Sequence, residues 1–121
     1  MSGFQPLPAG SMQWVKNSLG AEVTRLVTEG AVMTVVRGVK GDQVPAHGYS
    51  RGAVTYVVSG RVKIDDVELG PGDGGNYTPA SEGYYGVTFL EDSMYVVVRS
   101  AADHITLPDI GERAADNLDS G

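Results

Sequence analysis

The chain has 121 residues, a length typical of one domain, and it contains no cysteine, which excludes disulfides, thiol nucleophiles and zinc–thiolate sites. Nine basic against fifteen acidic residues give a formal net charge of −6, a balance that disfavours binding to nucleic-acid phosphates. No stretch reaches the ~18 apolar residues of a membrane helix, and residues 1–11 lack the basic and apolar regions of a secretory signal. We therefore expect a soluble cytoplasmic protein whose partner is a small molecule, with no nucleic acid and no membrane as partner.

Short β-rich runs follow one another from residue 22 onward. Residues 1–11 contain two prolines and two glycines, which interrupt any regular period, so a flexible arm is predicted there. The later runs are rich in Val, Thr and Tyr, and Gly, Pro, Asp or Ser occupies the breaks between them. The predicted strands are 22–28, 31–39, 43–47, 53–59, 61–64, 67–69, 76–78, 84–90 and 94–99.

This pattern has no long helical period and is typical of an all-β sandwich or barrel. A double-sheet jelly roll would solve the edge-strand problem that so many short strands create. We predict one domain over residues 12–107 and a C-terminal tail over 108–121, with one helical turn around 112–117.

Five residues between positions 41 and 60 have the spacing of a known motif. They are Gly41, His47, Tyr49, Ala53 and Gly60. The first motif of the cupin superfamily runs Gly, five residues, His, one residue, His, three or four residues, Glu, six residues, Gly. In this chain Tyr49 replaces the second His and Ala53 replaces the Glu. The sequence therefore resembles a cupin whose site has been altered.

The second cupin motif resembles this chain in its opening residues. Gly72 begins it, and its His position falls on Gly83 when the residues are counted strictly. When the count is anchored on Pro79 with one residue inserted, the His position falls on Tyr84 and the Asn position on Thr88. Neither count gives a histidine.

The resemblance covers about residues 12–107 and implies the cupin double-stranded β-helix, a jelly-roll barrel. The chain is similar to small single-domain bacterial cupins of the pectin-degradation and polyketide-cyclase types. In metal-binding cupins three His and one Glu hold a divalent ion inside the barrel. A phenol ligates a metal only when it is ionised, and its reference pKa is about 10, so this altered set would bind a metal poorly. We predict no metal and no other cofactor, and we do not expect His104, beyond the last predicted strand, to reach the site.

Alternation along strands places the candidate residues on common faces. If His47 faces the interior, then Tyr49, Ala53 and Thr55 face it too, while Tyr84 and Thr88 share a face of the later strand. The predicted catalytic residues are His47, as general base or acid, with Tyr49 and Tyr84 as hydrogen-bond donors to a developing enolate oxygen. The predicted substrate-binding residues are Arg51, which could meet a carboxylate at the barrel mouth, and Ala53, Thr55, Tyr77 and Thr88.

We favour a metal-independent lyase, isomerase or cyclase that acts on a small carbonyl-containing metabolite. A non-catalytic small-molecule-binding cupin is the alternative, because one pocket would serve both functions, and a metal-dependent cupin with unusual ligands is a third. A tyrosine-rich interior is also consistent with a packed core whose hydroxyls bind backbone atoms. The resemblance further implies a homodimer, and the arm before Trp14 is a candidate for exchange between the two copies.

Overall fold

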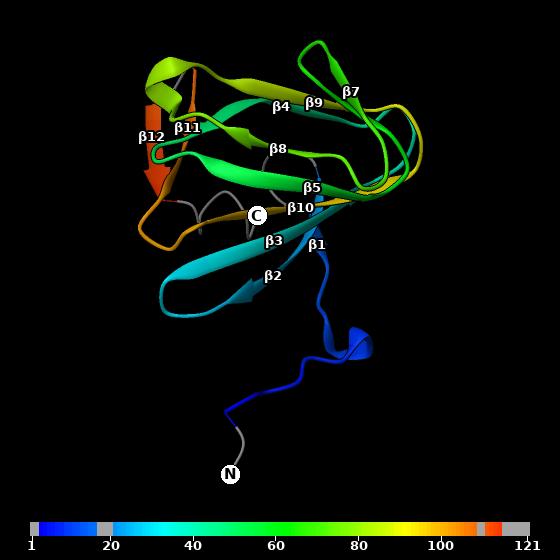
Figure 1. The fold of residues 1–121 in the computed structure, drawn as a ribbon, viewed down its shortest axis with the longest axis vertical. Helices are drawn as coiled ribbons and strands as arrows, with labels where there is room; N and C mark the ends of the chain where they lie inside the picture. The colour runs from blue at the N-terminus through cyan, green and yellow to red at the C-terminus, as the bar shows by residue number, and fades with distance from the viewer. Residues whose placement is uncertain (1–2, 17–20, 109–110, 115–121) are drawn as a thin grey trace.

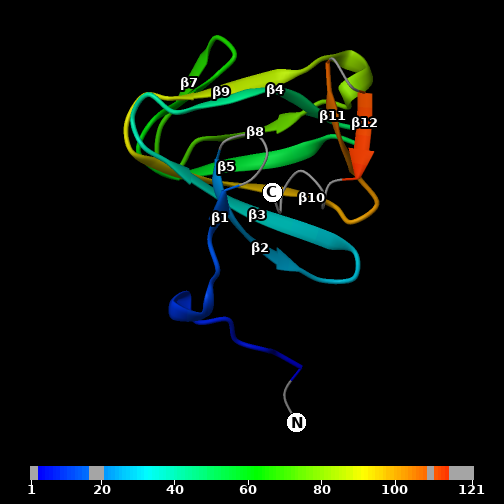
Figure 2. The ribbon, with the colours of Figure 1, turned by 180° about the vertical axis from the view of Figure 1, so that it is seen from behind.

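The computed structural model describes residues 3–16, 21–108 and 111–114, which form two facing six-stranded antiparallel sheets (Figures 1 and 2). The first sheet contains, in spatial order, β1 (Val15–Lys16), β2 (Glu22–Val27), β3 (Ala31–Gly38), β10 (Ser93–Ser100), β5 (Ala53–Ser59) and β8 (Gly74–Tyr77). The second contains β12 (Gly111–Ala114), β11 (His104–Leu107), β4 (Gln43–Tyr49), β9 (Tyr85–Phe89), β6 (Val62–Ile64) and β7 (Val67–Leu69). The described residues also include two short 3₁₀ helices, η1 (Ala9–Ser11) and η2 (Ala80–Glu82).

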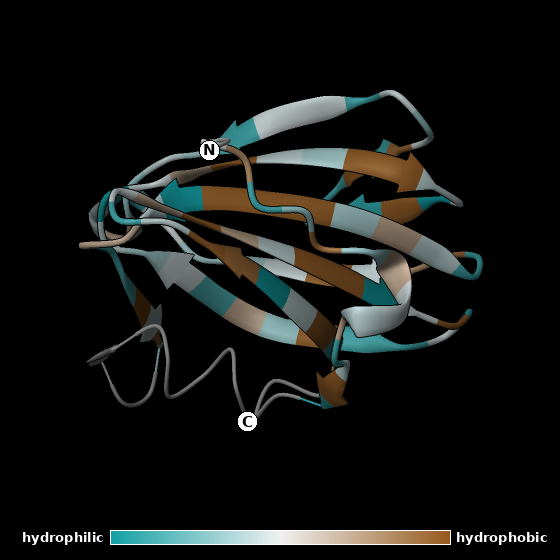
Figure 3. Cartoon of the chain, turned by 90° about the horizontal axis from the view of Figure 1, so that it is seen from below, coloured by the Kyte–Doolittle hydropathy of each residue, from teal (hydrophilic) through white to brown (hydrophobic). Residues whose placement is uncertain are grey.

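The core lies between the two sheets because side chains alternate between the faces of each strand. In β10 the buried side chains are every second one from Tyr95 to Arg99, and β3 buries Val32, Thr34 and Val36 in the same way. Figure 3 shows the resulting succession of hydrophobic and hydrophilic residues along the strands. Burial of a large apolar side chain in such a core contributes roughly 1.5–3 kcal/mol.

Each predicted β-rich run occurs as a strand with small shifts at its ends, which confirms the all-β fold. Three strands were not predicted: β1, which pairs with β2, and the strands β11 and β12. β11 pairs with β4, and β12 pairs with β11. The helical turn expected around 112–117 is wrong where the structure describes it, because Gly111–Ala114 is a strand; residues 115–117 lie outside the described part. His104 therefore begins a strand instead of following the last one.

A β-bulge in β4 determines which of its side chains face the core. Val44 pairs with Val87 and His47 pairs with Tyr85, so two residues of β4, Pro45 and Ala46, lie opposite one residue of β9, Gly86. The extra residue in the bulge reverses the alternation, and both Val44 and His47 are buried. Pro45 follows Val44 in this bulge, where its missing N–H removes no ladder hydrogen bond.

The N-terminal arm extends away from the sheets (Figures 1 and 2). It is joined to the first sheet where the Arg37 guanidinium lies 3.8 Å from the centre of the Trp14 ring. Among the described residues, no helix has the length and apolar character needed to cross a membrane.

Candidate functional site

Polar side chains line a small cavity between the two sheets, the inner cavity. It has a volume of about 20 Å³, and its walls include Thr34, Val44, His47, Tyr49, Tyr95 and Arg99. A cavity needs roughly 10–15 Å³ to hold one water molecule. The inner cavity therefore has room for about one water-sized group, but not for a whole metabolite.

His47 and Tyr49 form a hydrogen-bonded pair in this cavity. His47 Nδ1 lies 2.9 Å from the Pro45 carbonyl oxygen, which only accepts, so Nδ1 carries a proton and donates it. In the neutral ring Nε2 is then the acceptor, and the Tyr49 hydroxyl, 3.1 Å away, donates to it. Both side chains are buried, at 5% and 7% exposure. The bulge that turns His47 inward thus also fixes its tautomer through the Pro45 carbonyl.

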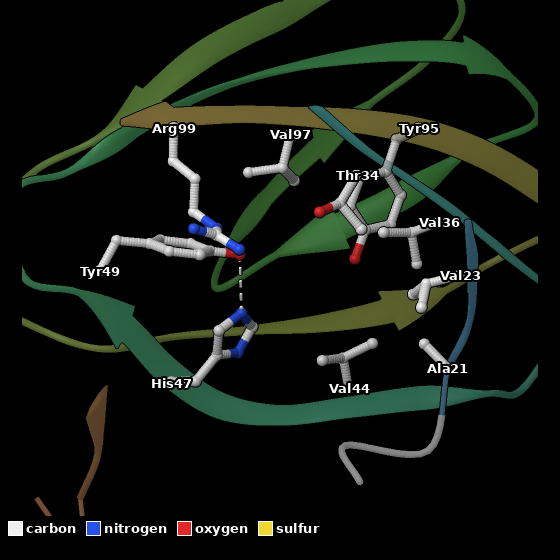
Figure 4. A pocket seen from close by; sticks show the side chains of 10 residues that line it. All are labelled: Ala21, Val23, Thr34, Val36, Val44, His47, Tyr49, Tyr95, Val97 and Arg99. Carbon is white, nitrogen blue, oxygen red and sulfur yellow. Dashed lines mark hydrogen bonds between the residues drawn. The ribbon is translucent and has the colours of Figure 1, made fainter. Parts of the chain in front are cut away.

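Arg99 is a residue of this site that the sequence analysis missed. It is only 4% exposed and lines the inner cavity. Figure 4 shows its guanidinium, the Tyr49 hydroxyl and the His47 ring pointing toward one another. The sequence could have predicted its burial, because Tyr95, Val97 and Arg99 share one face of β10 and the first two are typical core residues. The inner cavity therefore combines a cation, a phenol and an imidazole.

A row of four rings extends from His47 across the barrel. Centroid distances are 5.3 Å from His47 to Tyr49, 5.4 Å from Tyr49 to Tyr77 and 5.2 Å from Tyr77 to Tyr85. These are favourable aromatic separations. Tyr77 pairs with Ala53 in the ladder between β8 and β5, so the row runs beside the position where the motif would place a glutamate.

The donor atoms of this row do not suit a divalent metal. His47 Nε2 already accepts the Tyr49 hydroxyl proton, and the other rings are phenols that must ionise before they can ligate. No group of three or more His, Cys, Asp or Glu side chains in the described residues could hold a metal. The metal that the fold family implies therefore does not fit these residues.

Burial raises the pKa of the Tyr77 hydroxyl from 10.0 to about 12. Loss of hydration is the largest cause, because the phenolate would lie in a poorly solvated interior, and the Asp65 carboxylate adds to the rise. A hydrogen bond with Thr55 partly offsets it. Tyr77 is consequently a neutral hydrogen-bonding group throughout the physiological range.

Three predicted substrate-binding residues, Arg51, Ala53 and Tyr77, line one open groove of about 590 Å³, the outer groove. Arg99 also lines it, so this side chain connects the outer groove with the inner cavity. Arg51 forms no ion pair within the described chain. Its guanidinium is therefore available to an anionic ligand.

Asp103, which is 2% exposed, accepts hydrogen bonds from the turn that carries Arg51. Asp103 Oδ1 accepts from Ser50 Oγ at 2.5 Å, from the Arg51 N–H at 2.8 Å and from the His104 N–H at 2.8 Å. Gly52 follows with φ +84°, and a Cβ there would lie 2.6 Å from the Tyr77 carbonyl oxygen. Only glycine fits this close approach without a shift of the backbone.

Tyr84 and Thr88 lie away from the inner cavity, so the face expected for them is wrong. β9 begins at Tyr85, and Tyr85, Val87 and Phe89 carry its inward side chains. Tyr84 is 37% exposed and lies near Gly48, while Thr88 is on the outer side of β9 opposite Gln43 and Lys63. The motif count placed the inward histidine position one residue too early, and a shift of one residue exchanges the two faces of a strand.

Thr55 and Tyr77 also line a second pocket, the side pocket, of about 260 Å³. Tyr85, Ile64, Leu69 and Gly75 are among its other walls. It lies at the free edges of the two sheets, between β8 and the hairpin of β6 and β7. The predicted site residues other than Tyr84 and Thr88 thus divide among the inner cavity, the outer groove and the side pocket.

No protein-family model and no curated protein matches this chain. Solved structures do match. An RmlC-like cupin from Shewanella frigidimarina has 18% identity and a TM-score of 0.68, over 84% of this chain and 93% of the other. KdgF from Halomonas sp. has 21% identity and a TM-score of 0.67, over 77% and 89%.

A cupin-superfamily sugar phosphate isomerase from Silicibacter pomeroyi has 15% identity and a TM-score of 0.71, over 88% of this chain and 83% of the other. These three structures share the arrangement of strands with this chain while differing in most residues. The chain therefore has the cupin fold, which confirms the fold that its motif spacing predicted.

Proposed function

We propose that this cupin-fold chain is an acid–base enzyme of the lyase, isomerase or cyclase type that works without a metal on a small carbonyl-containing metabolite. The hydrogen bond between the Tyr49 hydroxyl and His47 Nε2 carries the proposal. It lies in a cavity that Arg99 also lines, so a proton acceptor and a stabilising cation face the same space. Proton transfer next to a carbonyl needs both groups.

The pair can move a proton without creating an isolated buried charge. The Tyr49 oxygen takes a proton from the carbon next to the substrate carbonyl, while the Tyr49 hydroxyl proton passes to His47 Nε2. The C–H electron pair moves to the carbonyl oxygen, which becomes an enolate, and His47 becomes an imidazolium. Return of the proton to another carbon gives isomerisation, and loss of a leaving group gives elimination.

Arg99 supplies the positive charge that the enolate requires. Groups of this kind contribute most where water is excluded, and removal of one oxyanion donor costs roughly 2.7–4 kcal/mol of barrier in known enzymes. His47 and Tyr49 are both buried, so the reacting oxygen would meet fixed protein groups instead of solvent.

The two cavities limit the size and charge of the substrate. The inner cavity admits only the reacting group, so the remainder of the molecule would lie in the outer groove. Arg51 and Arg99 line that groove, and an arginine pairs well with a carboxylate. A small 2-oxo acid combines the carbonyl and the carboxylate that these residues favour.

Non-catalytic binding is the second candidate, and the small volume of the inner cavity favours it. A ligand that fills the outer groove alone would not reach the His47–Tyr49 pair. The two candidates make different predictions for Tyr49, which is needed for proton transfer but not for binding in the groove.

Isotope exchange tests the proposal directly. We expect the protein to accelerate exchange of the C3 hydrogens of 2-oxobutyrate in deuterium oxide, followed by proton NMR, and Tyr49→Phe to slow this about 10²-fold or more. Butanone, which lacks the carboxylate, is the matched control compound and should exchange more slowly. Thermal stabilisation by 2-oxobutyrate with no exchange would instead support a binding protein.

A further inference from the structure

The side pocket contains a glycine that has no packing reason in the described chain. Gly75 lies opposite Thr55 in the ladder between β8 and β5, so it shares the inward face with Thr55 and Tyr77. Its φ is not positive, and a Cβ added there would meet no atom within 4 Å. A side chain would fit, and its absence leaves the side pocket open beside the exposed edge strand β8.

A glycine in a strand weakens the strand and often marks close approach by a ligand or another backbone. The neighbouring Gly74 shows the contrast, because a Cβ there would lie 2.8 Å from the Thr55 carbonyl oxygen. Gly74 is therefore explained by the protein itself. Gly75 is not, and as an exposed residue of the edge strand β8 it leaves this wall of the side pocket open.

The walls of the side pocket favour an uncharged ring. Ile64, Val67 and Leu69 line it together with the Tyr77 and Tyr85 rings, whose planes are tilted by 52° to each other. Aromatic faces in this arrangement accept a further ring by stacking or by edge contact.

The polar side chains that line the side pocket are three hydroxyls, the Asn76 amide and one carboxylate. Thr55, Tyr77 and Tyr85 supply hydroxyl oxygens that can accept a hydrogen bond from a hydroxyl substituent, while the Thr55 proton is donated to the Val96 carbonyl and the Tyr85 hydroxyl is hydrogen-bonded to Thr78. Asp65 is the only charged residue among the described walls, and its carboxylate would repel an anion. This charge is opposite to that of the outer groove, where Arg51 and Arg99 lie.

The volume sets the size of the ligand. A cavity of about 150 Å³ holds one benzene ring. The side pocket, at about 260 Å³, has room for two fused rings or for one ring with a substituent.

We infer that the side pocket is a binding site for an uncharged aromatic molecule of one or two rings with a hydroxyl or carbonyl substituent, admitted by the missing side chain of Gly75. This inference is independent of the acid–base function, because neither His47 nor Tyr49 lines the side pocket. Tyr77 lines both the side pocket and the outer groove, so the tests below use Gly75, which lines the side pocket but not the outer groove.

Two matched probes test the charge and the ring together. We expect 2-naphthol to bind with a dissociation constant of about 0.1–1 mM by calorimetry, a normal affinity for a ligand of this size. 2-Naphthoate has the same rings and a negative charge, and it should bind at least tenfold more weakly. Equal affinity for the two probes would contradict the role of Asp65.

Gly75→Leu tests the location, because the new side chain would fill the space that the ring needs. It should weaken 2-naphthol binding at least tenfold. Gly10→Leu is the matched control, since Gly10 also has no atom within 4 Å of an added Cβ but lies in η1. Unchanged binding by the Gly75 variant would overturn the inference.

Amide NMR on the unmodified protein gives a second measurement that does not depend on the variant folding. We expect 2-naphthol to shift the signals of Gly74, Gly75 and Asn76 in β8 and those of β7. Shifts confined to other strands would also overturn the inference.

Discussion

Replacing Tyr77 by phenylalanine should change how the free energy of unfolding depends on alkaline pH. Folding raises the pKa of Tyr77 from 10.0 to about 12, so the folded state holds this proton more tightly than the unfolded state does. The stabilisation of the folded state by the neutral Tyr77 hydroxyl is therefore complete below pH 10, and it is lost as the pH rises through 10 toward 12. Linkage with these two pKa values gives a loss of about 1 kcal/mol at pH 11 and about 2 kcal/mol at pH 12.

Tyr77→Phe removes this loss but also removes the hydrogen bond with Thr55, which is worth about 1 kcal/mol. Wild type should be the more stable protein at pH 8, the two should be equal near pH 11, and the variant should be the more stable at pH 12. Urea unfolding at each pH, followed by circular dichroism, measures the difference. Tyr56→Phe is the matched control, because Tyr56 is 50% exposed and should leave the wild-type pH dependence unchanged. If the free energies of unfolding of wild type and Tyr77→Phe changed with pH in parallel, the role given to Tyr77 would be refuted.

Three other predictions follow from the same contacts. Asp103→Ala leaves Ser50 Oγ and the Arg51 N–H without their acceptor, while the His104 N–H keeps Ser50 Oγ, so the free energy of unfolding should fall by about 3 kcal/mol; an unchanged urea midpoint would contradict the role given to Asp103. Treatment with a chelator should leave the exchange of 2-oxobutyrate hydrogens unchanged, whereas restoration of lost activity by added iron, manganese or nickel would revive a metal-dependent reaction. Sedimentation should show the predicted homodimer, and Tyr56→Lys, on the outer face of β5 between half-exposed Val54 and Val58, should shift it toward monomer if that face forms the interface.

Much of the fold could be predicted from the sequence because its central strands alternate cleanly. β3, β5 and β10 each bury every second residue, and turn formers separate them from their neighbours. β11 is short and pairs with the distant β4, and pairing over such a distance leaves no local signal in the sequence. β12 forms a local hairpin with β11, but its residues Gly111–Ala114 lack the β-branched and aromatic side chains typical of a strand.

The candidate site was only partly predictable, for reasons that can be traced to single residues. His47 and Tyr49 came from motif spacing, but the bulge that turns His47 inward depends on pairing with β9, which no local pattern reveals. Tyr84 was chosen where Tyr85 faces inward, since a one-residue error in a motif with an insertion reverses a strand face. Arg99 could have been found by stepping two residues at a time from Tyr95, although a charged residue on a core face contradicts the usual pattern.

The central claim is that His47 and Tyr49 move a proton as one unit, and a double-mutant cycle on the exchange rate tests it most directly. His47→Gln and Tyr49→Phe should each remove most of the acceleration of 2-oxobutyrate exchange, and the double variant should be no slower than the slower single variant within about threefold, because residues that act together are strongly non-additive. If the two losses instead multiply, the residues act independently and the proposed relay is wrong.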